Sequence, residues 1–108
     1  MSQFTLDDLA AIINERSSAS AASSYTKSLL DSGIERVAKK FGEEAVETVI
    51  ASMAGDKDAL VNETADVLYH LLVLLRCCDI PLDAVMTELG QRTRQSGHAE
   101  KSGRQEKN

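Results

Sequence analysis

Two pairs of acidic residues, each pair three positions apart, are the part of this sequence best suited to chemistry. Glu44 and Glu47 form one pair, and Glu63 and Asp66 form the other. Residues three apart on a helix lie on one face, one turn from each other. If the two helices pack side by side, four carboxylates can face one another. Such an all-oxygen site suits Mg²⁺ or Mn²⁺, whereas zinc would call for His or Cys ligands.

The alternative interpretation is that these are ordinary acids on solvated helix surfaces. Against it, Glu63 and Asp66 directly precede residues 67–75, which are apolar on almost every face of a helix. Carboxylates at the margin of a core need a partner, because an unpaired buried charge is strongly unfavourable. Basic residues nearby are too few to pair them all, so we favour a cation site.

Three neighbouring side chains are candidates for supporting roles. Lys40 lies four residues before Glu44 and could meet a substrate phosphate or simply pair with Glu44. His70, four residues after Asp66, could support a ligand or the substrate, or be a hydrogen-bonded core residue. Glu43 lies on a different face from Glu44 and is a weaker candidate for the general base.

The elements that must position these residues are all predicted to be helices. Apolar periodicity predicts helices over residues 5–16, 34–54, 59–78 and 82–94, and a short turn or helix over 26–31. Gly55 is a good helix stop, and Pro81 can open the last helix. We therefore expect an all-α fold, a bundle of four to five helices formed by residues 1–94 and followed by a polar tail, 95–108.

The long helix over residues 34–54 has an unusual interior. Gly42 costs roughly 1 kcal/mol there relative to alanine. Either a neighbouring helix packs closely against it, or it leaves room for a ligand beside Glu43 and Glu44. Glu44 is expected at the edge of the helix's apolar face. That face is expected to comprise Val37, Phe41, Ala45 and Val49.

Composition excludes several classes of protein. The net charge of −5 argues against nucleic-acid binding, which needs a basic face. One Pro and few aromatic residues argue against a β-sandwich or barrel.

Cys77 and Cys78 are adjacent on a helix and poorly placed for a mutual disulfide, so we expect reduced core residues. Residues 67–75 are too few to span a bilayer and the first residues do not resemble a signal peptide, so we expect a cytoplasmic protein.

The predicted helix over residues 59–78 carries more apolar surface than a small bundle covers easily. The residues concerned are Val67, Leu68, Leu71, Leu72, Leu74 and Leu75. A second copy could bury the surplus by presenting the same surface, so we expect a homodimer. The first and last helices could cover it instead, through Leu9, Ile12, Ile13, Leu82, Val85 and Leu89.

The two acidic motifs also carry a family resemblance. Glu-Glu-x-x-Glu at 43–47 followed by Glu-x-x-Asp at 63–66 resembles the signature of the MazG-like all-α nucleoside-triphosphate pyrophosphohydrolases. The longer stretches 24–26, 39–47, 63–75 and 96–101 are similar to one family in that superfamily, the phosphoribosyl-ATP pyrophosphohydrolases. The resemblance implies hydrolysis of phosphoribosyl-ATP to phosphoribosyl-AMP and diphosphate, a step of histidine biosynthesis.

The resemblance also implies roles for individual residues. Mg²⁺ would be held by Glu44, Glu47, Glu63 and Asp66, with Glu43 as a further catalytic candidate. Substrate would be contacted by Lys40, His70, Tyr25 and Lys101, and Thr26 could also reach phosphate or ribose. The alternative within the superfamily is a house-cleaning enzyme acting on (d)NTPs. A non-catalytic helical interaction module and a carboxylate-bridged di-iron bundle are the other classes considered, and the second lacks the paired Glu-x-x-His motifs it needs.

Overall fold

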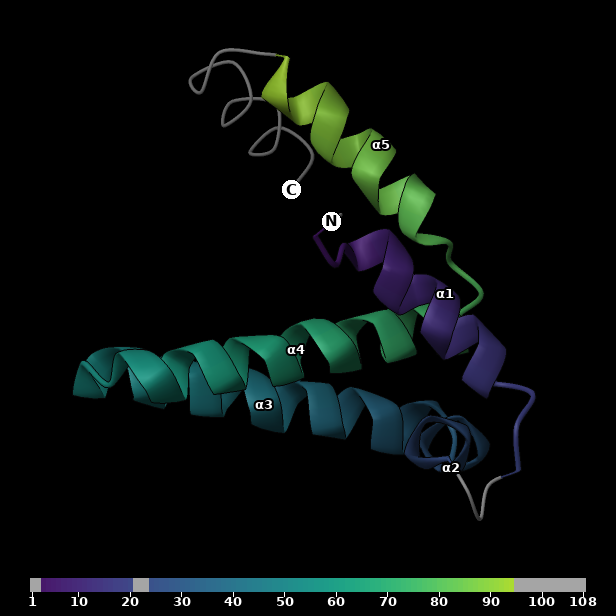
Figure 1. Cartoon of the computed structure of the whole chain (residues 1–108), viewed down its shortest axis with the longest axis horizontal. Coiled ribbons are helices and arrows are strands. Elements are labelled where there is room, and N and C mark those ends of the chain that lie inside the picture. Colours follow the sequence, from purple (N-terminus) through teal and green to yellow (C-terminus); the bar gives the residue numbers. More distant parts are fainter. Residues whose placement is uncertain (1–2, 21–23, 95–108) are drawn as a thin grey trace.

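The computed structural model describes residues 3–20 and 24–94, and these form five α-helices without a strand (Figure 1). The helices are α1 (Leu6–Arg16), α2 (Tyr25–Asp31), α3 (Ile34–Ala54), α4 (Lys57–Cys77) and α5 (Leu82–Thr93). The all-α class is confirmed, and each predicted helix end lies within two residues of the observed one. The predicted polar tail lies outside the described residues, and none of the helices described is long and apolar enough to cross a membrane.

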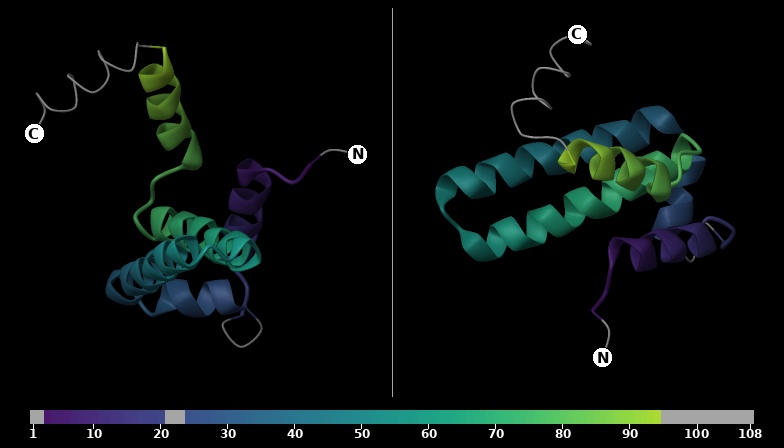
Figure 2. Two further views of the ribbon diagram at one scale, coloured as in Figure 1. Left: turned by 90° about the vertical axis from the view of Figure 1, so that its left-hand side faces the viewer. Right: turned by 90° about the horizontal axis from the view of Figure 1, so that it is seen from above.

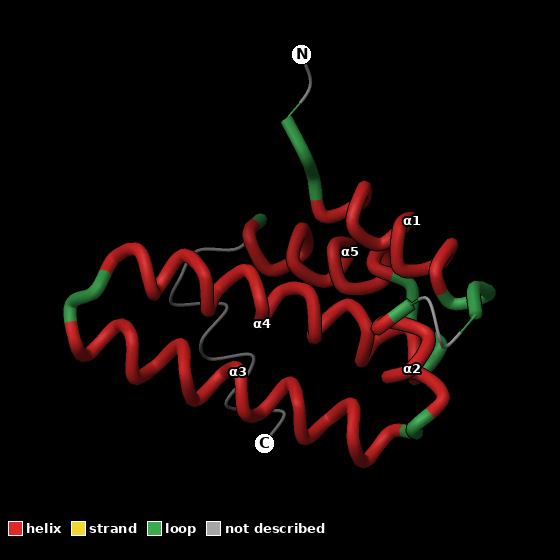
Figure 3. Tube along the Cα trace, turned by 60° about the horizontal axis from the view of Figure 1, so that its bottom comes forward, coloured by secondary structure: helices red, strands yellow, loops and turns green. Residues whose placement is uncertain are grey.

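The centre of the fold is a hairpin in which α3 and α4 run antiparallel, side by side (Figures 1 and 3). The connection is tight because Gly55 takes up a left-handed conformation with φ of 73°, which glycine adopts at little cost. The Gly55 and Asp56 amides donate back to α3 carbonyls, and the Asp56 side chain caps α4 by accepting from the Ala59 amide at 3.0 Å. The predicted stop at Gly55 is therefore confirmed.

The hydrophobic core lies at the end of the hairpin away from this turn, where α1 and α2 pack (Figure 1). Its buried members are Ile13, Leu29, Val37, Leu72 and Val73. α1 begins at a capping box, in which the Thr5 hydroxyl accepts from the Asp8 amide and the Asp8 carboxylate accepts from the Thr5 amide. The core thus fixes one end of the hairpin and leaves its middle open on one side.

The exposed apolar surface lies mainly on α3 rather than on α4, where it was expected. Of the six α4 residues named above, Leu72 is buried and Leu68 is the most exposed, at 36%. By contrast, α3 exposes Val46, Val49, Ile50 and Met53 by 59–83%. The reason is that α3 and the first helix already cover most of α4, whereas no described element covers the outer side of α3.

The last helix stands apart from this arrangement. α5 projects away from the hairpin and buries none of its residues (Figure 2). Leu82 packs against the edge of the core, but Met86 and Leu89 are each 46% exposed. Of the two cysteines, both free, Cys77 is half-buried and Cys78 is exposed, so the prediction of a core position is wrong for Cys78. Cys78 follows the last turn of α4, where the chain leaves the core.

Candidate active site

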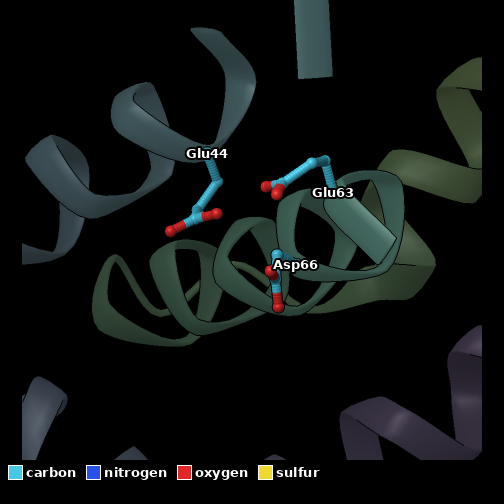
Figure 4. A group of neighbouring side chains, drawn as sticks. All are labelled: Glu44, Glu63 and Asp66. Atoms are coloured by element: carbon cyan, nitrogen blue, oxygen red, sulfur yellow. The ribbon is translucent and has the colours of Figure 1, made fainter. Parts of the chain in front are cut away.

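Three of the four predicted metal ligands come together in the middle of the hairpin. Glu44 projects from α3 toward Glu63 and Asp66 of α4 (Figure 4). One carboxylate oxygen from each of the three lies within 4.8 Å of the other two. The short connection at Gly55 sets this register, because it places the middle of α3 opposite the first half of α4.

Glu47, the fourth predicted ligand, lies at the margin of this cluster. It is exposed, one turn after Glu44 on α3. Its carboxyl is nevertheless close enough to both Glu44 and Glu63 to affect their protonation. The four acids are therefore neighbours, with three forming a compact group and Glu47 at its solvent side.

The crowding of these acids is reflected in their protonation. Burial, reinforced by the neighbouring carboxyl of Glu47 and by the charge of Asp66, raises the pKa of Glu44 above its usual range. The pKa of Glu63 is raised as well, first by burial and then by Glu47, with Glu44 and Asp66 contributing through their charges. Like charges held this close in a partly desolvated place favour the neutral acid unless a cation joins them.

Two buried oxygens in this cluster are without a hydrogen-bond partner in the described part of the chain. They are Oε2 of Glu44 and Oε2 of Glu63. A buried acceptor left unsatisfied is costly. The Lys40 ammonium does not pair with these two atoms. Its Nζ lies 3.9 Å from Glu44 Oε1 and 3.8 Å from Glu43 Oε1, which are long ion-pair distances to other oxygens. Unpaired hard oxygen donors facing one another fit a hard divalent cation such as Mg²⁺ or Mn²⁺.

The position of Glu44 differs from the prediction. Glu44 was expected at the edge of the apolar face, but it is only 9% exposed and lies in line with Val37 and Ala51, both buried. Val49, predicted on that face, is 60% exposed. At ~100° per residue, a four-residue step drifts by ~40° around the helix and a seven-residue step by only ~20°. The buried face follows the seven-residue steps, and these run through Glu44.

Of the two explanations for Gly42, close packing of a neighbouring helix is excluded for the described residues. A methyl group added at this glycine would meet nothing within 4 Å, so no other described helix requires the small residue. Gly42 instead lines an open groove of about 700 Å³ along the flank of α3. The other residues lining it are Lys40, Glu43, Glu44, Val46 and Glu47. The groove gives a phosphate-bearing ligand access to the carboxylates and to the Lys40 ammonium.

His70 is both a hydrogen-bonded core residue and a neighbour of the acids. It is 6% exposed, and its Nδ1 lies 2.7 Å from the Asp66 carbonyl oxygen. A carbonyl only accepts, so Nδ1 carries the proton and Nε2 of the neutral ring is free to accept. The Tyr25 hydroxyl lies 3.4 Å from Nε2 and can donate to it. A positive charge on the His70 ring, when the ring is protonated, would oppose the rise in the pKa of Glu44.

The remaining predicted contacts divide into three cases. Tyr25, at the start of α2, is 52% exposed and available to a ligand. Thr26 is 1% exposed, so the expected contact with phosphate or ribose is wrong, and its hydroxyl instead bonds to that of Tyr69. Lys101 lies outside the described residues. Tyr69 was not singled out from the sequence, because a tyrosine in an apolar helix reads as an ordinary core residue.

Comparison with known proteins gives one consistent result. The sequence profile described as phosphoribosyl-ATP pyrophosphohydrolase matches residues 6–93. The phosphoribosyl-ATP pyrophosphatase of Azorhizobium caulinodans is 56% identical over 101 residues, covering 94% of this chain and 93% of that protein. The protein of the same name from Agrobacterium fabrum is 56% identical over 104 residues, covering 96% and 97%. The Rhizobium etli protein is 54% identical over 105 residues, covering 97% and 98%. The chain belongs to the phosphoribosyl-ATP pyrophosphohydrolase family.

Proposed function

We propose that this protein hydrolyses phosphoribosyl-ATP to phosphoribosyl-AMP and diphosphate in histidine biosynthesis, and that the reaction depends on Mg²⁺. The family and the names of the relatives support the reaction. The observation that supports the metal is the pair of buried, unpartnered carboxylate oxygens on Glu44 and Glu63, with Asp66 beside them. Mn²⁺, which has similar ligand preferences, is expected to substitute.

The chemistry requires neutralised phosphate charge, an activated water and correct positioning. Glu44, Glu63 and Asp66 would hold the cation, with Glu47 completing the set from the solvent side. A bound Mg²⁺ supplies charge neutralisation and lowers the pKa of a coordinated water. The Lys40 ammonium, 33% exposed at the groove, can bind a phosphate oxygen. Glu43 is exposed beside Lys40 and can take a proton from the attacking water, although any of the four ligands could do so.

The substrate can be tested by a panel assay with detection of diphosphate. Phosphoribosyl-ATP, ATP and the dNTPs are compared in millimolar Mg²⁺, in Mn²⁺ and in EDTA. We expect rapid release of diphosphate from phosphoribosyl-ATP alone, loss of release in EDTA, and recovery on adding metal. Faster turnover of a dNTP would instead support a house-cleaning enzyme, and turnover unaffected by EDTA would refute the metal.

We also propose that the protein works as a homodimer in the cytoplasm. The apolar stripe of α3, defined here as Val46, Val49, Ile50 and Met53, supports the dimer. Its members recur at spacings of three and four, which suits packing against another helix. Burying such a stripe against its counterpart in a second copy removes apolar area from water in both copies at once.

A further inference from the structure

A cluster of aromatic and hydroxyl side chains joins α2 to α4 beside the carboxylates. The Thr26 hydroxyl on α2 is hydrogen-bonded to the Tyr69 hydroxyl on α4. The Tyr69 ring is stacked on that of Tyr25, with centroids 6.3 Å apart and planes inclined by 20°. It also meets the His70 ring edge-on, at 5.0 Å and 90°. Tyr69 therefore contacts every other member of the cluster.

The cluster ends at the candidate metal site. Tyr25 is placed to donate to His70 Nε2, and His70 Nδ1 donates to the backbone carbonyl of Asp66. Each nitrogen of the imidazole thus has its own partner, and these two bonds together fix both its tautomer and the rotation of its ring. The order of contacts runs from Thr26 through Tyr69 and Tyr25 to His70 and then to Asp66.

The position of α2 depends on few contacts. Its seven residues are too few for a helix that is stable by itself. Only Thr26 and Leu29 are buried. Leu29 supplies non-directional apolar contact with the core, whereas the bond from Thr26 to Tyr69 has a direction and so fixes how α2 is rotated against α4. That rotation decides where Tyr25, the residue directly before Thr26, holds its hydroxyl.

We propose that Tyr69 and Thr26 are positioning residues for the pyrophosphohydrolase reaction. Their hydrogen bond holds Tyr25 against His70 and so keeps the imidazole in one orientation beside Asp66 and Glu44. Neither residue needs to contact the substrate. The inference rests on the proposed function, since it assigns the pair a role in that reaction.

A purely structural contact would not need these two hydroxyls. A phenylalanine at 69 and a valine at 26 have nearly the same shapes, and replacing both partners of a buried hydrogen bond by apolar groups can be nearly neutral for stability. What the apolar pair would lose is the direction of the contact. The two roles can therefore be separated by substitutions that keep shape and remove the bond.

The test compares Thr26→Val, Thr26→Ser and Tyr69→Phe in the full chain with phosphoribosyl-ATP and Mg²⁺. We expect Thr26→Val and Tyr69→Phe each to lower kcat/KM about 10- to 100-fold, the range found when groups that orient active-site residues are removed. Thr26→Ser keeps the hydroxyl and should retain near-normal activity. The double variant Thr26→Val, Tyr69→Phe should have a kcat/KM no lower than that of the less active single variant, because each single substitution already removes the same hydrogen bond.

A spectroscopic signature is available because the chain has two tyrosines and no tryptophan. The near-ultraviolet circular dichroism of tyrosine therefore reports this cluster alone. Thr26→Val should have a weaker tyrosine band than the wild type, and Thr26→Ser should have a band of normal intensity. Both variants retain Tyr25 and Tyr69, so the difference would report how the two rings are held. Mg²⁺ affinity, measured by calorimetry, should change little, because the carboxylates lie on α3 and α4.

Ile13→Val is the matched control, since it removes one methylene from the buried core on α1 and leaves every hydroxyl of the cluster in place. It should lower the melting temperature by an amount comparable to Thr26→Val and leave kcat/KM unchanged. If Thr26→Val and Tyr69→Phe behave like Ile13→Val, losing stability but not activity, the positioning role is overturned while the proposed function stands. An inactive wild type would overturn both.

Discussion

The two faces of α3 reverse the usual distribution of charged and apolar residues. On the inner face, Glu44 occupies the buried line between Val37 and Ala51, where an apolar residue is the rule. On the outer face, the apolar stripe of α3 is exposed, where charged residues are the rule. Each departure leaves a free-energy cost in the isolated chain. The proposed cation would relieve the cost on the inner face, and the proposed second copy would relieve the cost on the outer face. Each face of the helix therefore has its own proposed ligand.

The largest expected effect comes from removing a negative charge at the candidate metal site between the inner face of α3 and α4. Glu44→Gln, Glu47→Gln or Asp66→Asn should lower kcat/KM about a thousandfold or more, because the amide keeps the shape but holds a cation poorly. Glu35→Gln, an exposed acid on the outer side of α3, is the matched control and should have normal activity. Steady-state kinetics decide, with circular dichroism to show intact helices. Near-normal turnover by the inner-face variants would refute the metal site.

On the outer face, a charge should separate the two copies. Ile50→Glu places a carboxylate in the apolar stripe of α3, and we expect the dimer dissociation constant to rise about 100-fold or more because the charge would be buried without a partner. Light scattering across a concentration series measures this. Ala11→Glu adds the same charge to an exposed position on α1 and should leave the dimer intact. A wild type that is monomeric and fully active at micromolar concentration would show that no second copy is needed.

Metal addition tests the inner face without substrate. Millimolar Mg²⁺ should raise the melting temperature of the wild type by roughly 5–10 °C, because the cation binds carboxylates that are brought together only in the folded hairpin. The shift should largely disappear in Glu44→Gln. Identical melting curves in EDTA and in Mg²⁺ would count strongly against a built cation site.

A smaller effect is expected from pH in the absence of metal. Because the pKa values of Glu44 and Glu63 are raised in the folded state, the folded protein holds more protons than the unfolded chain in the interval above the usual glutamate range. The free energy of unfolding should therefore fall as pH rises through that interval. Urea unfolding in EDTA at a series of pH values measures the slope, which Glu44→Gln should reduce. A rise of stability with pH across this interval would contradict the assignment of these two groups.

Sequence patterns predicted the helices well because their ends carry local signals. Gly55 and Pro81 interrupt the periodic runs, and Thr5 with Asp8 forms a recognisable cap. The spacing of the acidic pairs likewise placed the candidate site on the facing sides of two helices. These features depend on residues within one or two turns of each other, so they are visible in a single sequence.

Tertiary packing decided what the sequence could not. The burial of Glu44 depends on how α4 lies against α3, and an apolar pattern at four-residue spacing pointed to the wrong line of residues. The bond between Thr26 and Tyr69 joins residues far apart in the chain, and neither has a local pattern that pairs it with the other. The exposed apolar surface was predicted on α4 because α4 is the more apolar helix in composition. The exposure of a side chain depends instead on which neighbours its helix has.

The tight turn at Gly55 also has a consequence for the order in which the molecule assembles. All four acids lie within one hairpin, so bringing them together closes only a short loop and carries a small entropy cost. Contacts that are local in sequence generally form fast. We expect the carboxylates to meet early in folding, before α1 is docked at the far end. A cation bound at that stage would bridge the carboxylates of α3 and α4. It would favour the correct register of the hairpin before the remaining helices have packed.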